Sequence, residues 1–164
     1  MKKNIPKTII IFSIIFTALT ICIINRKPAS IAPFTDIVWG NSLDDIQESE
    51  GDSYEKSLSM SGGYNYIYPK QYLETDGYVQ YNINDNGILC GISWFYITNV
   101  QQNADEIYSS IQKDTSSYLG KENSLDTSNI YTGKKWETNE SNIILISFSQ
   151  NNEYAVQISY LLKE

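Results

Sequence analysis

The sequence of 164 residues contains no histidine and only two cysteines. Without histidine, the chain lacks both the commonest metal ligand and the commonest general base of enzymes. We expect Cys22 and Cys90 not to pair, because Cys22 lies in an apolar run near the N-terminus and Cys90 in a predicted strand. Cys90 has no basic neighbour that would make its thiol reactive, so we interpret it as a small buried hydrophobic residue. The sequence therefore predicts no cofactor and no metal.

Basic residues are scarce in the body of the chain. Five of the 12 lysines and arginines flank the apolar N-terminal run, namely Lys2, Lys3, Lys7, Arg26 and Lys27. Seven basic residues remain beyond position 35 against all 19 acidic residues, an excess of 12 negative charges. A body of this charge repels phosphate backbones, so we exclude nucleic acid as a partner.

The long apolar run covers Thr8 to Ile24, which are 17 residues without a charge. This length is near the short limit for spanning a bilayer. Positive charge is in excess before the run, which predicts a cytoplasmic N-terminus and an exported body. We therefore expect an N-terminal membrane anchor over residues 1–27, with the transmembrane helix at 8–24. The alternative is secretion after signal-peptide cleavage, for which the best cleavage site, Ser30-Ile31-Ala32, lies too far from the run.

The remaining chain has the length of one domain. Residues 28–34 contain Pro28 and Pro33 and are typical of a tether, so we predict a single extracytoplasmic domain over 35–164. Ser42 as N-cap, Asp45 three residues later and a closing Gly51 predict a short helix.

The stretch Gly77 to Ile97 predicts a long β-hairpin. Asn86-Gly87 is a favoured dipeptide for a two-residue turn, and this turn places Ile83 opposite Cys90, with one apolar face. Before it, alternating residues from Tyr54 to Tyr68 predict another hairpin, which Pro69 ends, followed by a polar connection at 70–76.

Apolar residues at helical spacing predict a helix over Asn103 to Leu119, capped by Asn103, that covers the central hairpin. After a polar loop at 121–129, three strands are expected, at 130–136, 144–148 and 156–160. We expect a three-residue loop between the last two, which pairs Ile146 with Ile158. The predicted fold is α+β, with an antiparallel sheet of six or seven strands and two helices mainly on one face.

Three patterns match catalytic or metal sites only in part. Residues 82–87 resemble the start of a calcium loop, but Ser93 stands where a bidentate glutamate is needed. Ser110 with Lys113, and Ser53 with Lys56, have S-x-x-K spacing without the accompanying elements of a serine enzyme. Carboxylates gather on one helix face and just after it, which we interpret as solvated surface; they are Asp44, Asp45, Glu48, Glu50 and Asp52.

The tyrosines between positions 64 and 78 are the candidate binding residues. Tyrosine is large, fairly rigid and tipped with a hydroxyl, which suits contacts with proteins. Core packing is the competing interpretation of the same residues. The candidate surface consists of Tyr64, Tyr66, Tyr68, Tyr72 and Tyr78.

The run 37–46, IVWGNSLDDI, resembles the helix start of small exported bacterial α+β domains. Its Trp39-Gly40-Asn41-Ser42 segment is similar to that of the β-lactamase inhibitor protein family and of the small lipoprotein subunit of the outer-membrane barrel-assembly machinery. The sequence departs from the lipoproteins by lacking their processed cysteine, and from the inhibitors by lacking a clear tandem repeat and disulfides. The resemblance implies an extracytoplasmic protein-binding domain rather than an enzyme, and it carries over no functional residue.

We therefore expect a membrane-anchored extracytoplasmic binding domain that is not an enzyme. The expected partner is a protein of the cell envelope or outside it. Two alternatives stay open: an inhibitor or immunity-type protein directed against a secreted enzyme, and an extracytoplasmic hydrolase with a serine or carboxylate centre.

Overall fold

The computed structural model describes residues 30–60, 62–125 and 131–163, so the expected membrane helix at 8–24 lies outside the described residues. Within the described ranges, no helix is both long and apolar enough to cross a membrane. In chain order the described elements are α2 (Leu43–Glu50), β1 (Glu55–Leu58), β2 (Tyr64–Tyr72), β3 (Thr75–Ile83), β4 (Leu89–Thr98), α3 (Gln101–Leu119), β5 (Asn123–Ser124), β6 (Tyr131–Glu137), β7 (Ser141–Gln150) and β8 (Glu153–Leu162).

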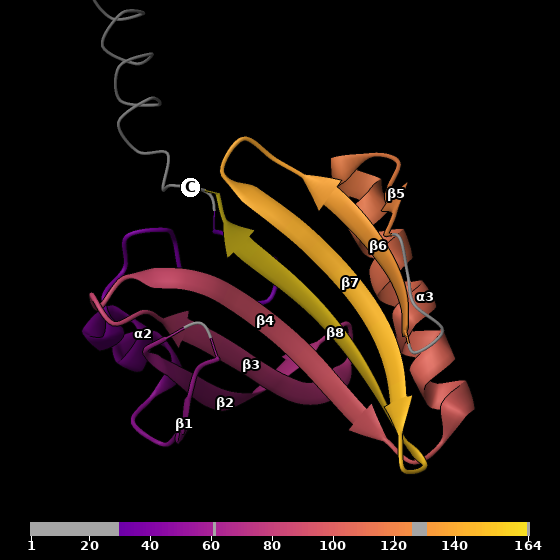
Figure 1. The fold of residues 1–164 in the computed structure, drawn as a ribbon, viewed down its shortest axis with the longest axis horizontal. Coiled ribbons are helices and arrows are strands. Elements are labelled where there is room, and N and C mark those ends of the chain that lie inside the picture. The colour runs from indigo at the N-terminus through magenta and orange to yellow at the C-terminus, as the bar shows by residue number, and fades with distance from the viewer. Residues whose placement is uncertain (1–29, 61, 126–130, 164) are drawn as a thin grey trace, which may run out of the picture.

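The strands form one antiparallel sheet of eight strands in the order β1-β2-β3-β4-β8-β7-β6-β5. The order of one helix followed by four strands therefore occurs twice. β4 and β8, the last strands of the two units, pair with each other at the centre. Both helices add side chains to one buried cluster and lie behind the sheet in Figure 1, at its two ends.

The α+β prediction is confirmed, but the sheet has eight strands instead of six or seven. The additional strand is β5, whose two residues lie in the stretch that we expected to be a polar loop. Two residues are too few to show an alternating pattern in the sequence. They form a strand because they pair with the edge of β6.

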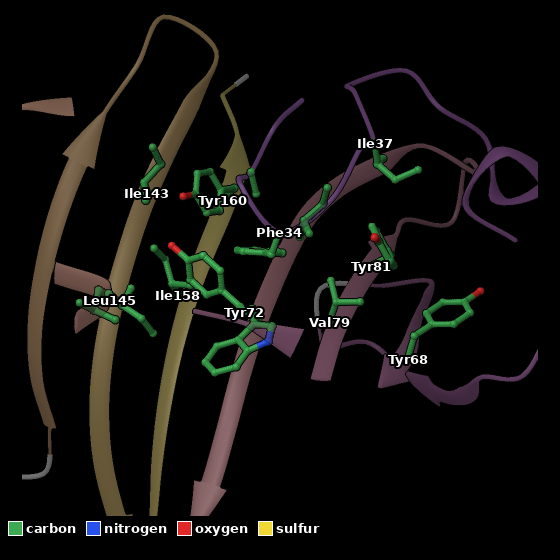
Figure 2. Packing of buried hydrophobic residues seen from close by; sticks show 14 of the residues in the cluster. Phe34, Ile37, Tyr68, Tyr72, Val79, Tyr81, Ile143, Leu145, Ile158 and Tyr160 are labelled. Carbon is green, nitrogen blue, oxygen red and sulfur yellow. The ribbon is translucent and has the colours of Figure 1, made fainter. Parts of the chain in front are cut away.

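The chain that precedes α2 is part of the core. Ala32, Phe34 and Ile37 are buried, and the ring of Phe34 meets those of Tyr72 and Tyr160 edge to face, at centroid distances of 5.2 and 5.8 Å. Figure 2 shows Phe34 between the residues of the two units. The packed domain therefore includes part of the tether expected at 28–34.

The short helix α2 has the predicted ends. Ser42 Oγ accepts the backbone N–H of Asp45 at 3.2 Å, and Asp45 Oδ2 accepts the backbone N–H of Ser42 at 2.7 Å. Hydrogen bonds from the Ser42 backbone and side chain lower the pKa of Asp45. Gly51 ends the helix with a φ of +96°, and Ile46 is its one buried residue.

The central hairpin has the predicted register over most of its length, from Val79 opposite Trp94 to Asn82 opposite Gly91. Its turn is different. The backbone N–H of Asn84 donates to the carbonyl of Ile88 at 2.9 Å, so the loop has three residues, 85–87, instead of the predicted two.

A bulge compensates for the longer loop, and it moves one cysteine. The register shifts between Asn82 and Ile83, so that Ile83 faces Leu89 instead of Cys90. Cys90 instead contacts the Asn82 side chain, with Sγ 2.6 Å from Oδ1, and is only partly buried. The prediction that Cys90 lies on the apolar face of the hairpin is therefore wrong.

Pro69 does not end the second strand. β2 continues to Tyr72, and a two-residue turn at Leu73-Glu74, with φ of +48° and +61°, leads directly into β3. β1 pairs with β2 only as far as Ile67, so Pro69 lies where β2 is an edge of the sheet. The missing backbone N–H of Pro69 therefore costs the sheet little stability.

The long helix α3 begins at Gln101, two residues earlier than predicted, with Val100 as N-cap and no side-chain cap from Asn103. It packs mainly on β7 and β8 and less on β4. The expectation that it covers the central hairpin is therefore wrong for β3. β7 and β8 belong to the same unit as α3, and α3 also reaches β4 because β4 pairs with β8.

The last hairpin has the loop that we expected to be disfavoured. Asn151 and Asn152 form a two-residue turn with φ of +53° and +65°, which places Ile146 opposite Gln157. The prediction assumed that Ile146 and its neighbours face the core. In the structure Ile143 and Leu145 face it instead, and β7 is apolar on both sides.

A buried carboxylate joins α2 to the sheet. The side chain of Glu50 is 4% exposed and accepts hydrogen bonds from Lys70 Nζ at 2.9 Å and from Tyr81 Oη at 2.6 Å. Thr35 lies 2.7 Å from the same tyrosine hydroxyl. Glu50 is therefore not part of the solvated acidic surface that we expected.

We expect Glu50→Gln to lower the free energy of unfolding by about 2 kcal/mol, because it leaves Lys70 partly buried without its counter-charge. Urea unfolding followed by tryptophan fluorescence measures this. Glu48→Gln, on the exposed side of the same helix, is the control and should change the value by less than about 0.5 kcal/mol. Equal effects of the two substitutions would contradict the assigned role.

Tyr68 belongs to an aromatic cluster under β1. Its ring lies 5.6 Å from that of Tyr54 and 5.9 Å from that of Tyr81. Among the described residues, its buried hydroxyl has no hydrogen-bond partner. Burial raises the pKa of Tyr68 to about 12 from the ordinary value of 10.0, so the folded state keeps this phenol neutral where the unfolded chain ionises it.

We expect Tyr68→Phe to raise the free energy of unfolding at pH 7 by about 1 kcal/mol, since it removes a buried hydroxyl without a partner. The stability linked to this phenol is complete below pH 10 and is lost as the pH rises to about 12. Over this pH range the free energy of unfolding should therefore fall less steeply in the variant than in the wild type. The difference between the two slopes should be about 1.4 kcal/mol per pH unit. Tyr64→Phe, at an exposed position, should leave both quantities unchanged.

Candidate functional site

The five candidate tyrosines do not form one surface. Tyr66, Tyr68 and Tyr72 are buried in the core, whereas Tyr64 and Tyr78 are 42% and 45% exposed. The exposed pair lies on opposite sides of the sheet, because Tyr64 is opposite the core residue Ile83 and Tyr78 is opposite the exposed Pro69. Core packing thus accounts for three of the five, and Tyr78 is the one on the side away from the helices.

The buried tyrosines are fixed by hydrogen bonds and by ring contacts. Tyr72 Oη donates to Asp114 Oδ2 at 2.8 Å, which ties β2 to α3. Burial, followed by this hydrogen bond, raises the pKa of Tyr72 far above its ordinary value. Tyr66 packs edge to face on Tyr54, with a centroid distance of 5.2 Å. Both are structural residues.

The residues with S-x-x-K spacing lie at the surface. The hydroxyl of Ser110 donates to the carbonyl of Glu106 at 2.9 Å, one helical turn earlier, and Lys113 is exposed. Lys56 Nζ lies 3.8 Å from the ring centroid of Tyr64. Ser110 and Lys56 are thus engaged with local neighbours, and neither is paired with a lysine or serine of its own S-x-x-K stretch.

The oxygen-rich stretch at 82–87 is used to build its own turn. Asn84 Oδ1 accepts the backbone N–H groups of Asn86 and Ile88, both at 3.0 Å. Asp85 Oδ1 accepts the backbone N–H of Gly63 at 2.8 Å. Among the described residues, no group of three or more acidic or cysteine side chains is placed to hold a metal ion.

The sheet has one side that the described helices leave uncovered, which we call the outer face. The alternation along the strands defines its residues, and the pairing of β3, β4, β8 and β7 aligns them in rows. These strands contribute Asp76, Tyr78, Gln80, Asn82, Gly91, Ser93, Phe95, Ile97, Ala155, Gln157, Ser159, Leu161, Asn142, Ile144, Ile146 and Phe148 to the outer face.

Charge is almost absent from the middle of the outer face. Asp76 is the one charged residue among the positions just named, and it lies near the beginning of β3. Other charges of this side in the described residues lie on the outlying strands or at a strand end: Glu55 on β1, Lys135 with Glu137 on β6, Glu153 where β8 begins and Lys163 just after β8. The body as a whole is strongly acidic, so this uncharged area stands apart from the rest of the surface.

The exposed apolar side chains of the outer face lie next to a small polar group. The rings of Tyr78 and Phe95 stack at a centroid distance of 5.5 Å, while Ile97 is 53% and Phe148 36% exposed. In the adjoining row of the sheet, the hydroxyls of Ser93 and Ser159 are 2.8 Å apart and buried, and Gln157 Nε2 donates to Ser159 Oγ at 2.8 Å. These polar groups satisfy one another, which leaves the aromatic and aliphatic groups available for contact.

A small pocket of about 190 Å³ continues the outer face toward β1. Tyr78 forms one of its walls, and a carboxylate, Glu55, lies on its far side. The lining residues are Ser53, Tyr54, Glu55, Ile67, Pro69 and Tyr78. The outer face thus combines a nearly uncharged area with one recess large enough for a side chain.

Sequence reasoning missed most of the outer face. It assigned Ile144, Ile146 and Phe148 to the core, whereas they lie opposite the outer-face residues Ser159, Gln157 and Ala155. The signal was present, because Ile143 and Leu145 are equally apolar and both sides of β7 then need cover. Comparison with known proteins adds nothing to this picture: no family model matches the chain, and searches of curated proteins and of solved structures found no match.

Proposed function

We propose that this chain is a non-catalytic protein-binding domain and that the outer face is its docking surface. The observation that carries the proposal is a nearly uncharged sheet face that the described helices leave uncovered and that exposes Tyr78, Ile97 and Phe148, in a body with 12 excess negative charges. Monomeric proteins rarely expose large apolar areas without a partner.

The composition of the outer face is that of an interface. The centres of protein interfaces are depleted of charge and enriched in aromatic residues, and their rims are polar. Tyr78 and Phe95 supply the aromatic pair, and the nearby pocket accepts one side chain of the partner. The rim is mainly acidic, so the partner should carry basic residues around an apolar centre.

The place where binding occurs follows from the N-terminal sequence. The uncharged run at 8–24, with excess positive charge before it, supports a single-pass membrane anchor with the domain outside the cytoplasm. The partner in this proposal is a protein of the cell envelope or its surroundings. Secretion of the cleaved domain would leave the docking surface unchanged.

Inhibition of a secreted enzyme is the second candidate function. The resemblance at 37–46 pointed to the β-lactamase inhibitor protein family, from which the sequence departed by its lack of a clear tandem repeat. The repeated order of one helix and four strands removes part of this difference. A hydrolase is the weaker alternative, because Ser110 and Lys113 are exposed and the Ser110 hydroxyl is bonded to the helix backbone.

We expect Tyr78→Ser, combined with Phe148→Ser, to weaken partner binding at least tenfold, because aromatic residues at the centre of an interface contribute most of its binding energy. Photo-crosslinking with p-benzoylphenylalanine at position 78 in intact cells identifies the partner. The affinity of the purified partner for full-length protein in nanodiscs then measures the loss.

Tyr64→Ser is the matched control, since Tyr64 has nearly the same exposure on the opposite side of the sheet. This substitution should leave the affinity unchanged. Equal crosslinking from positions 64 and 78, or equal loss with the two substitutions, would reject the outer face as the docking surface. If the partner is a secreted enzyme whose activity falls on binding, the inhibitor function is the correct one.

A further inference from the structure

A second recess lies away from the outer face, where the chain enters the domain. This pocket of about 580 Å³, which we call the entry pocket, is bounded by the segment before α2, the end of α3, the β6–β7 turn and the sheet. Its lining residues are Ser30, Ile31, Val38, Trp39, Tyr118, Leu119, Thr138, Glu140, Ser141, Ile143 and Tyr160. The volume is typical of pockets that hold small molecules.

The walls of the entry pocket are held in place. Its floor is the cross-strand pair Ile143 and Tyr160, which are buried and lie side by side in Figure 2. Trp39 Nε1 donates to Ser141 Oγ at 3.2 Å, and the hydroxyls of Tyr118 and Tyr160 are 2.8 Å apart. The rings of Trp39 and Tyr118 are thus held at the walls of the pocket, and the ring of Tyr160 is buried in its floor.

Among the described residues that line the entry pocket, Glu140 alone is charged, and it is exposed. The nearby Lys163 is engaged elsewhere, since its Nζ donates to the carbonyl of Thr138 at 2.8 Å and lies 3.4 Å from Glu137 Oε2. Among the ion pairs of the described residues, none includes Glu140, so its carboxylate is available to a ligand.

We propose that the entry pocket binds a small organic cation with an apolar body. Aromatic rings attract a cation through the negative charge of their faces, and the apolar walls take up the body of the ligand. The carboxylate of Glu140 completes the set by pairing with an ammonium group at the rim. An anion of the same size would meet this carboxylate and the general negative charge of the body.

Three probes with the same chain length and different head groups test the proposal: hexylammonium, hexanol and hexanoate. Full-length protein in nanodiscs of zwitterionic lipid is labelled with 5-fluorotryptophan and observed by fluorine NMR. The three tryptophans give three signals, and Trp39→Phe assigns the one from the pocket. Trp94 and Trp136 are buried outside the pocket lining and serve as internal controls.

We expect hexylammonium to shift the Trp39 signal saturably, with an affinity about threefold higher than that of hexanol. A difference of this size is typical of the contribution of one exposed ion pair. Hexanoate should bind more weakly than hexanol. Glu140→Gln should abolish the preference for the cation without weakening hexanol, while Glu153→Gln, at the start of β8, should change nothing. Val38→Phe, which fills the space, should remove binding of all three probes.

Two results would overturn the proposal. One is a Trp39 signal that none of the probes shifts, which includes the case in which another part of the chain already fills the pocket. The other is a preference for the cation that persists in Glu140→Gln. Unchanged Trp94 and Trp136 signals in each variant show that the fold is intact, so loss of binding is not attributed to unfolding.

Discussion

The pairing of β4 with β8 is the interaction on which the rest of this structure depends. It joins the two units into one sheet, with Gly91 opposite Leu161 at one end and Thr98 opposite Tyr154 at the other. A four-stranded unit with a single helix would leave much of its apolar side uncovered. Joined at the centre, the two units share one cluster to which both helices and the segment before α2 contribute.

This arrangement separates two kinds of surface. On the side of the helices, polar groups are paired with at least one partner buried, such as Glu50 with Lys70 and Tyr72 with Asp114, and these pairs fix the helices to the sheet. On the outer face, the buried polar pair is Ser93 with Ser159, and the exposed large side chains beyond it, such as Tyr78 and Phe148, are apolar. The first side is closed by its own contacts, whereas the second side has apolar groups that the described chain does not cover, which is why we propose it as the docking surface.

The two proposed sites make different demands on the chain. The outer face depends on strand register, since a shift of one residue would exchange Ile144 and Ile146 with Ile143 and Leu145. The entry pocket depends on how the segment at 30–39 lies against α3 and the β6–β7 turn. A substitution that alters one site need not alter the other, so protein binding and cation binding can be measured separately.

The sequence by itself determined the elements that depend on neighbouring residues: the α+β class, the capped helix at 43–50, the long helix and the central register from Val79 to Asn82. Tertiary structure decided the three-residue loop at 85–87, the two-residue loop at 151–152 and the side of β7 that faces the core. For β7 the reason is that both of its sides are apolar enough to be buried. Local pattern then gives no preference, and the choice is made by partners distant in sequence, above all β4 and β8.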